Sequence, residues 1–295
     1  MDRKAFLGCL IALLALAACS SQHRITVGSK NFTEQVILGE IIAQQIENRL
    51  HQPVERKLNL GGMLLAHQAL LAKDIDLYPE YTGTAFANIL KSGGVTDPEV
   101  VLDRVRSYYA TRLQIEWLPP LGFNSSFALT VRGDDARARH LVTLSDAARD
   151  PAGFALGAGY EFLTHPDGFA ALNAKYPIKW TAPTRTMDLG LLYRALMDKQ
   201  VSLVAANTTD GVLNKLDVRV LEDDKHAFPP YQACIVVRSD TLAAYPDLRG
   251  ILSELSGKIP DDVMRRMNYA VDGDHRPVRD VAREFLKNAG LATAP

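Results

Sequence analysis

The residues best suited to chemistry in this chain are two tyrosines, Tyr81 and Tyr231, each placed after a predicted strand. A quaternary ammonium group cannot donate a hydrogen bond, but an aromatic face attracts it by roughly 0.5–2 kcal/mol. Phe127 lies in an apolar run and offers a third face, while Lys30 and Thr84 offer donors for a carboxylate. Taken singly, each ring would more often pack in a core. Together they indicate a site for a small, partly cationic solute.

Enzymatic chemistry finds less support. The chain has no phosphate-loop, nucleophile-elbow or zinc-protease motif, and its seven histidines are scattered without metal-ligand spacing. Asp210 could act as a base, yet an Asx-type turn before Gly211 explains it more simply. The pair Gly61-Gly62 could bind an anion at a helix start or could only permit close packing. The sequence therefore predicts a binding protein with no catalytic residue, metal ion or cofactor.

A strand–helix alternation positions the candidate residues. The predicted strands before residue 80 are residues 24–28, 54–60 and 75–78. After the first strand, Asn31 and Glu34 fit a capping box that starts a helix. Such a βαβ series predicts a largely parallel sheet, and open sheets of this kind bind ligands beyond the carboxyl ends of their strands. Lys30 and Tyr81 both fall there.

The same alternation begins again after a helix predicted over residues 98–117. Residues 123–131 form a long extended run, a second α/β series follows, and residues 232–237 form another extended run. Both runs are interpreted as strands that cross between two lobes, with the final helices returning to the first lobe. Two crossings make a hinge and leave a cleft, which is a favoured place for a ligand. The predicted fold class is α/β, with two lobes, a ligand cleft between them and two crossing strands.

The N-terminus has the pattern of a signal peptide. Arg3 and Lys4 precede an apolar stretch, residues 6–18, that is too short for a stable membrane span. It ends in Leu16-Ala17-Ala18-Cys19, which resembles the lipobox of bacterial lipoproteins. That resemblance implies cleavage before Cys19 and lipid on its sulfur and amine. An ordinary signal peptide with an incidental cysteine is the alternative.

Composition and charge are those of a globular chain. Its 295 residues are 47% hydrophobic and 23% charged, and 33 basic against 34 acidic residues leave a net charge of −1. No run of Lys and Arg forms a face for nucleic acid. With Cys9 removed and Cys19 acylated, Cys234 is the remaining thiol, so no intramolecular disulfide is expected. Cys234 lies in an apolar run and is interpreted as a small buried hydrophobe.

Several motifs, in order along the chain, resemble the substrate-binding proteins of osmoprotectant ABC importers, which take up glycine betaine, choline and related compounds. The motifs are Val27–Gln35, Asn59–Gly62, Ile75–Thr84, Glu161-Phe162, Asp167-Gly168, Thr209–Gly211, Leu221–Lys225 and Phe228–Tyr231. The resemblance spans about residues 24 to 290. It implies the periplasmic-binding-protein fold, in which two α/β lobes close on a ligand.

The resemblance also implies site residues. Members of the family commonly hold an ammonium group in a box of tyrosine rings and a carboxylate with Lys, Thr and Arg. Three positions depart from that pattern, because Phe127 and Asn207 stand where Tyr is usual and His165 stands where Arg is usual. We therefore expect glycine betaine to bind weakly and a bulkier or more polar relative to bind better. The predicted ligand-binding residues are Lys30, Tyr81, Thr84, Phe127, His165, Asn207 and Tyr231.

The resulting hypothesis is an extracytoplasmic, membrane-anchored solute-binding component of an ABC importer for glycine betaine, choline or a related quaternary ammonium compound. Its expected partners are the permease, the ATPase subunit and the membrane, through lipid on Cys19. A receptor for another small zwitterion or amino-acid derivative is the main alternative, and a secreted enzyme or a sensory module on the same scaffold is less favoured. The predicted divisions are a signal peptide (1–18), a tether (19–23), a first lobe (24–128 and 232–295) and a second lobe (129–231).

Overall fold

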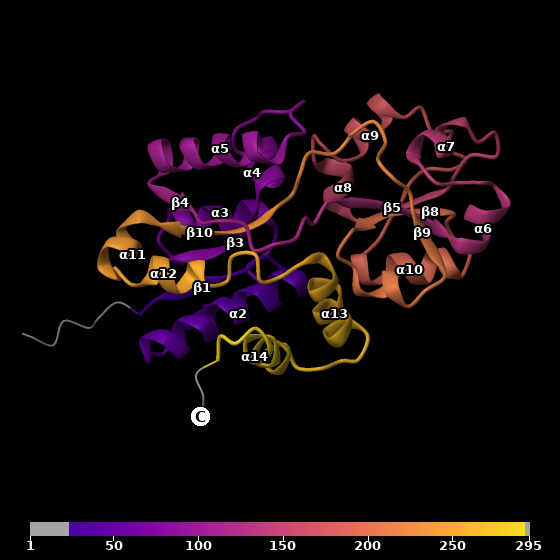
Figure 1. Ribbon diagram of the computed structural model, residues 1–295. Coiled ribbons are helices and arrows are strands. Elements are labelled where there is room, and N and C mark those ends of the chain that lie inside the picture. The colour runs from indigo at the N-terminus through magenta and orange to yellow at the C-terminus, as the bar shows by residue number, and fades with distance from the viewer. Residues whose placement is uncertain (1–23, 293–295) are drawn as a thin grey trace, which may run out of the picture.

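The computed structural model describes residues 24–292, which form two α/β lobes side by side (Figure 1). The strands of the first lobe are β1 (Thr26–Gly28), β2 (Glu55–Lys57), β3 (Leu77–Tyr81), β4 (Ile115–Trp117) and β10 (Ala233–Arg238). Those of the second lobe are β5 (Phe127–Arg132), β6 (Leu156–Ala158), β7 (Arg185–Thr186), β8 (Leu203–Asn207) and β9 (Val218–Val220). The two sheets have the orders β2-β1-β3-β10-β4 and β7-β6-β8-β5-β9.

Helices cover both faces of the first sheet. One layer contains α2 (Thr33–Leu50), α12 (Leu248–Ser253) and α14 (Val278–Asn288), and the other contains α3 (Met63–Leu71), α4 (Thr82–Asn88) and α5 (Pro98–Tyr108). Successive side chains of β10 point to opposite faces, so Ile235 and Val237 join the first layer while Cys234 and Val236 join the second. Burial raises the pKa of the Cys234 thiol to about 12, which fits the predicted packing role and leaves no reactive thiolate at neutral pH.

The second lobe repeats this construction. Its helices are α6 (Gly133–Ala138), α7 (Leu144–Arg149), α8 (Tyr160–Thr164), α9 (Phe169–Lys175), α10 (Leu189–Met197) and the 3-10 turn η2 (Gly211–Asn214). α10 packs its Leu192 and Leu196 with Val201 and Val204 of the sheet. Parallel pairing of β1 with β3, and of β6 with β8, brings the carboxyl ends of neighbouring strands to one edge of each sheet. Lys30, Tyr81 and Asn207 follow or end such strands, and the starts of the antiparallel strands β5 and β10 bring Phe127 and Tyr231 to the same edges.

Three segments connect the lobes. Residues 118–126 and 221–232 run between the sheets and pair once, at the antiparallel bridge between Asn124 and Gln232. The third connection is α13 (Asp261–Asp272), which packs against both α2 and η2 (Figure 1). The final helices therefore return to the first lobe as predicted, except that α13 also reaches the second.

The crossing backbone differs from the predicted crossing strands. The run predicted over residues 123–131 begins at Phe127 and pairs wholly within the second sheet, and the run predicted over residues 232–237 pairs wholly within the first. The crossing segments themselves contain Pro119-Pro120 and Pro229-Pro230. Proline lacks the N–H donor of a ladder hydrogen bond, so two successive prolines in each segment disfavour its pairing with either sheet.

The helix predicted over residues 98–117 is too long. α5 ends at Tyr108, a π-helical turn follows, and Gln114 ends the helical backbone with a left-handed φ of 56°. Ile115 and Trp117 then point into the core as alternate residues of β4. The strand predicted over residues 178–180 is reduced to a single bridge at Trp180.

Cys19, the signal peptide and the tether lie outside the described residues. The lobe limits predicted at residues 128/129 and 231/232 lie within them and stay predictions. Between residues 24 and 292, no helix combines the length and the apolar character needed to cross a bilayer.

Candidate functional site

On the first lobe, Lys30 and Tyr81 lie side by side beyond the ends of β1 and β3. The Lys30 ammonium forms a buried ion pair with Glu80 Oε1, and its Nζ lies 4.8 Å from the centroid of the Tyr81 ring. The other Glu80 oxygen accepts a hydrogen bond from the Tyr78 hydroxyl at 2.8 Å. The positive charge of Lys30 is therefore balanced within the protein.

Tyr81 is held by a second carboxylate, that of Glu34. The Tyr81 hydroxyl donates to Glu34 Oε1 at 2.6 Å, and Asn268 Nδ2 donates to Glu34 Oε2 at 3.1 Å. Burial raises the pKa of Glu34, and it raises the pKa of Tyr81 well above 10, with the neighbouring Glu34 charge adding to the effect on Tyr81. The phenol therefore stays protonated and donates. We call Lys30, Glu34, Tyr78, Glu80 and Tyr81 the charged group.

The role of Glu34 corrects the sequence prediction. Asn31 and Glu34 were expected to form a capping box, but Phe32 is the N-cap residue of α2 and no side chain caps the helix there. The Glu34 side chain turns instead toward Tyr81, because the helix begins at the carboxyl edge of the sheet. An acid in the first turn of a helix that follows a strand end is the signal that could have identified it.

Thr84 lies in the first turn of α4 and is buried. The neighbouring Gly83 allows the crossing segment to approach closely. A Cβ on Gly83 would lie 2.7 Å from the carbonyl oxygen of Pro230 and 2.9 Å from Cδ1 of Tyr231. The Tyr231 ring therefore packs directly on α4, which brings it to the first-lobe side of the site.

On the second lobe, Phe127 is surrounded by other rings. Its centroid lies 4.9 Å from that of Phe162, 5.4 Å from that of Phe228 and 5.7 Å from that of Tyr231, all in edge-to-face geometry. His165 stands 6.4 Å away in the same geometry. Edge-to-face pairs favour one another beyond the area they bury. Phe162 and Phe228 were not predicted as site residues, although both belong to the family-like motifs.

Tyr231 and His165 share a carboxylate that the sequence interpretation missed. The Tyr231 hydroxyl donates to Asp167 Oδ2, and His165 Nδ1 lies 3.5 Å from Asp167 Oδ1. His165 Nδ1 and Asp167 Oδ1 are both buried, and neither makes a hydrogen bond to another described residue. Burial, then the Asp167 charge, raises the pKa of the Tyr231 phenol well above 10. We call Phe127, Phe162, His165, Asp167, Phe228 and Tyr231 the aromatic group.

Asn207 ends β8 opposite Phe127 in the antiparallel ladder. Its backbone N–H donates to Asp210 Oδ2 at 3.0 Å, and the Tyr193 hydroxyl donates to the same oxygen at 2.9 Å. Burial raises the pKa of Asp210 to about 6. The Asp210 carboxylate thus closes the turn that places Asn207 beside Phe127, which is a structural role.

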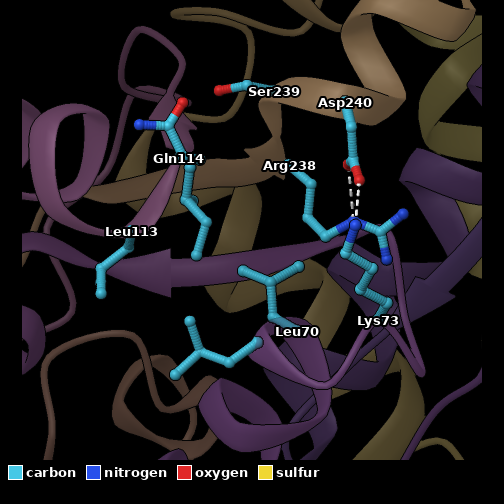
Figure 2. Close-up of a pocket in the computed structure, with 9 residues that line it drawn as sticks. Leu70, Lys73, Leu113, Gln114, Arg238, Ser239 and Asp240 are labelled. Carbon is cyan, nitrogen blue, oxygen red and sulfur yellow. Dashed lines mark hydrogen bonds and ion pairs between the residues drawn. The ribbon is translucent and has the colours of Figure 1, made fainter.

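The structure places five of the seven predicted residues in these two groups, while Thr84 lies next to Gly83 and Asn207 lies opposite Phe127. The groups approach each other at Tyr231, whose ring contacts Gly83 on one side and Phe127 on the other. A cavity of about 400 Å³ lies elsewhere on the first lobe, between α3 and the end of β10 (Figure 2). Its charged groups are paired, Lys73 and Arg238 with Asp240 at 2.7 and 2.9 Å. None of the seven predicted residues lines it. Within residues 24–292, no three His, Cys, Asp or Glu side chains gather in a way that would hold a metal ion.

Two α/β lobes that meet along aromatic and charged side chains define a bilobal solute-binding protein. Residues 23–288 match the family described as the substrate binding domain of ABC-type glycine betaine transport systems, and the chain belongs to this family. It is thus the extracytoplasmic substrate-binding component of an ABC importer of the glycine betaine type, and not an enzyme.

Individual relatives differ in the ligand that their names give. The chain is 35% identical over 268 residues to the ergothioneine transport permease/ergothioneine binding protein EgtU of Helicobacter pylori (strain G27), an alignment that covers 90% of this chain and 48% of that protein. It is 31% identical over 287 residues to the carnitine transport binding protein OpuCC of Listeria monocytogenes serotype 1/2a (strain 10403S), covering 94% and 93%. A crystal structure titled glycine betaine/carnitine/choline ABC transporter superposes with a TM-score of 0.79 at 28% identity, covering 90% of this chain and 99% of that one.

Proposed function

We propose that this chain binds a solute with a trimethylammonium group where the charged group and the aromatic group meet, and passes it to an ABC permease and its ATPase subunit. The observation that carries the proposal is the position of Tyr231. Its ring touches both lobes, and its hydroxyl is fixed by Asp167. A ligand against this ring would contact both lobes at once, and so would favour their closure.

The charges at the site support a cationic group on the ligand. Glu34, Glu80 and Asp167 are buried carboxyl groups, while Lys30 is the one buried lysine among the two groups and is already paired with Glu80. The rings of the aromatic group add faces that favour a cation whose methyl groups cannot hydrogen-bond. A trimethylammonium group satisfies both features, because it is positively charged and has an apolar surface.

The departures from the family pattern support a ligand larger than glycine betaine. Asn207 stands where the family commonly has a tyrosine ring, and its shorter amide side chain gives the position beside Phe127 a more polar character and more room for a ligand. His165 Nδ1 and Asp167 Oδ1 add two buried atoms without hydrogen bonds. Ergothioneine is the betaine of a thiolated histidine, and its imidazole N–H could donate a hydrogen bond to such atoms. The Helicobacter relative is named as an ergothioneine binding protein. We therefore favour an amino-acid betaine of this type over glycine betaine.

A thermal-shift screen of ergothioneine, carnitine, glycine betaine and choline tests the proposal. A solute at 100 times its dissociation constant stabilises a protein by about 2.7 kcal/mol, which is a measurable rise in Tm. Titration calorimetry then ranks the solutes that produce a shift. We expect ergothioneine to bind most tightly and glycine betaine weakly. A screen in which none of the four shifts the Tm would contradict the proposal.

We also propose that the mature chain is anchored by lipid on Cys19. Leu16-Ala17-Ala18-Cys19 supports it, although Cys19 lies outside the described residues. Growth of the expressing cells with a labelled fatty acid should label the unmodified chain, while Cys19→Ala should lose the label and should be released or stalled as a precursor. Label that persists in the variant would contradict the anchor.

A further inference from the structure

Asp223 lies near the start of the crossing segment 221–232, and its carboxylate accepts three hydrogen bonds. Its Oδ1 accepts from the Tyr176 hydroxyl at 2.6 Å and from the backbone N–H of Ala227 at 2.9 Å. Its Oδ2 accepts from the backbone N–H of Phe228 at 3.0 Å. A carboxylate accepts stronger hydrogen bonds than a neutral oxygen does. One side chain therefore fixes the backbone that leads into the aromatic group.

Tyr176 ties Asp223 to the second lobe. It is the residue that follows α9, and it is fully buried. Its hydroxyl donates to Asp223 and also accepts from the backbone N–H of Lys225 at 2.5 Å. Burial, then the hydrogen bond to Asp223, raises the pKa of the Tyr176 phenol, so the phenol stays protonated and donates. The crossing segment is thus attached to the end of α9.

The backbone of the turn at Asp223 needs this support. The backbone N–H of His226 donates to the Asp223 carbonyl oxygen at 3.1 Å, which closes a turn over residues 223–226. His226 itself has a left-handed φ of 53°. A residue other than glycine is uncommon in that region and persists where the surrounding structure holds it. Ala227 directly follows His226, so its hydrogen bond to the Asp223 carboxylate holds this backbone in place.

The chain beyond the turn carries this placement to the solute site. The Phe228 ring packs edge to face on the Phe127 ring, with 5.4 Å between their centroids. Pro229-Pro230 then leads to Tyr231, and proline fixes the backbone φ at about −65°. The backbone between Phe228 and Tyr231 therefore has little freedom, and a shift at Phe228 also displaces Tyr231.

We propose that Asp223 is a positioning residue of the solute site, which holds the rings of Phe228 and Tyr231 in place from the second lobe. The inference rests on the proposed function and deepens it, because it assigns a further residue to the same site. Tyr231 is also held from the other crossing segment, where Asn124 Oδ1 accepts from its backbone N–H at 2.6 Å. A ring that is already held in place costs less free energy to order on binding. Asp223 therefore raises the affinity for the trimethylammonium end of the solute.

Glu222 offers a matched control, because it is the neighbouring acid and is exposed. Its backbone N–H donates to the carbonyl oxygen of Val142 at 3.0 Å, and its carbonyl oxygen accepts from the backbone N–H of Leu144 at 2.8 Å. Glu222→Ala keeps both of these backbone hydrogen bonds. It changes the net charge as much as Asp223→Ala does, so the two variants separate the hydrogen bonds of Asp223 from its charge.

The experiment titrates ergothioneine, carnitine, glycine betaine and choline, each beside its counterpart without the methyl groups on nitrogen, by calorimetry. We expect Asp223→Ala to weaken binding of the preferred methylated solute by about tenfold and Glu222→Ala to change it by less than about twofold. Asp223→Asn keeps an acceptor oxygen and should lose less. Tyr176→Phe removes one of the three donors and should lose about threefold.

The unmethylated counterpart should lose much less affinity in Asp223→Ala, because it lacks the group that the rings contact. A general loss of stability would weaken both members of the pair alike. Equal losses for both members, unchanged affinity in Asp223→Ala, or the same loss in Glu222→Ala would overturn the proposal. If Asp223→Ala does not fold, Asp223→Asn and Tyr176→Phe decide it by the same comparison.

A measurement without solute separates this inference from the proposed function. Fluorotyrosine in the free chain gives a fluorine NMR resonance for Tyr231, which is assigned by its loss in Tyr231→Phe. The edge-to-face contact with Phe127, at 5.7 Å between centroids, makes this resonance sensitive to the position of the ring. We expect it to shift or broaden in Asp223→Ala and to stay in place in Glu222→Ala.

A Tyr231 resonance that Asp223→Ala leaves unmoved would overturn the positioning role, whether or not a solute binds. Absence of heat with all four methylated solutes, together with a displaced resonance in Asp223→Ala alone, would count against the proposed ligand class and would support the positioning of the ring by Asp223.

Discussion

The charged group on the first lobe and the aromatic group on the second satisfy their polar atoms in different ways. In the charged group, two carboxylates, a lysine and two phenols hydrogen-bond to one another, and Glu80 alone receives Lys30 and the Tyr78 hydroxyl. In the aromatic group, one carboxylate receives one phenol, and buried atoms of His165 and Asp167 are left without hydrogen bonds. The polar side-chain atoms of the first group all have partners within the protein, whereas the second group keeps two buried atoms without a hydrogen bond.

Because of this difference, we expect the charged group to contribute mainly to the stability of the fold and the aromatic group mainly to ligand binding. Removal of a member of the charged group leaves a buried charge without its partner, which costs free energy whether or not ligand is present. Removal of a ring from the aromatic group removes contact surface that a ligand would use. We therefore expect the largest effects of substitution on unfolding to come from the first lobe, and the largest effects on affinity to come from the second.

The largest expected effect is on stability, from Glu80→Ala. The substitution leaves the Lys30 ammonium buried without its carboxylate, and breaking a buried pair in this way lowers the free energy of unfolding by about 3–5 kcal/mol. Urea denaturation measures it. Asp217→Ala is the matched control, because it breaks the exposed ion pair with Arg137 and should change stability little. Equal effects of the two substitutions would remove the distinction between the charged group and an ordinary surface pair.

A second prediction uses Asp210, a buried acid that hydrogen-bonds to Tyr193 and Asn207. Its pKa is raised from 3.8 to about 6 by burial, so the folded protein holds the proton where the unfolded chain has lost it. Stability should therefore fall as pH rises from about 4 to about 6, by about 3 kcal/mol in all, and should not fall further above that range.

Urea denaturation of the unmodified chain and of Asp210→Asn at several pH values isolates this contribution. Asn can accept the same hydrogen bonds but does not titrate. The difference between the two free energies of unfolding should shift in favour of the variant as pH rises through that window. Parallel curves would show that Asp210 has the same pKa in the folded and unfolded chains.

Sequence reasoning predicted the architecture and the aromatic residues of the candidate site, but it did not predict the contacts of the buried carboxylates. The two lobes, the return of the final helices and the packing role of Cys234 followed from strand–helix alternation and apolar runs. Phe127, His165 and Tyr231 were selected from the sequence, and the structure places them together. Their role with ligand stays a prediction.

The carboxylates were missed because their partners are distant in sequence. Glu34 meets Asn268 across 234 residues and Asp167 meets Tyr231 across 64. A short sequence pattern cannot predict a contact between residues so far apart in the chain. At Glu34, the short pattern predicted a helix cap instead. The crossing segments were misassigned for a related reason, since an extended apolar run does not reveal which sheet receives it.

The third prediction concerns affinity. Tyr231→Ala removes the ring that contacts both lobes and should weaken binding of the preferred solute by roughly 1–3 kcal/mol, while Tyr231→Phe keeps the face and should lose less. Tyr160→Ser is the matched control, since that ring is exposed at the start of α8. Titration calorimetry gives the dissociation constants. An affinity that Tyr231→Ala leaves unchanged, with the fold intact, would place the ligand elsewhere.

The smallest expected effect is a gain in affinity for glycine betaine. Asn207→Tyr adds a ring beside Phe127 and should raise the affinity for glycine betaine by roughly 0.5–2 kcal/mol, or a few-fold to about thirtyfold. The same variant should bind ergothioneine less well, because the new ring fills the open end. A variant that gains affinity for both solutes would argue that Asn207 does not select for ligand size.

The most direct test of the proposed site is calorimetric titration of ergothioneine and of its unmethylated parent, a thiolated histidine, into the unmodified chain and into Tyr231→Ala. The two solutes differ only in the three methyl groups on nitrogen, so the cycle isolates the interaction between that group and the ring. We predict that loss of the methyl groups weakens binding to the unmodified chain by about tenfold or more, and binding to Tyr231→Ala by much less. Equal affinity of the unmodified chain for both solutes, or the same loss in both chains, would contradict a trimethylammonium site at Tyr231.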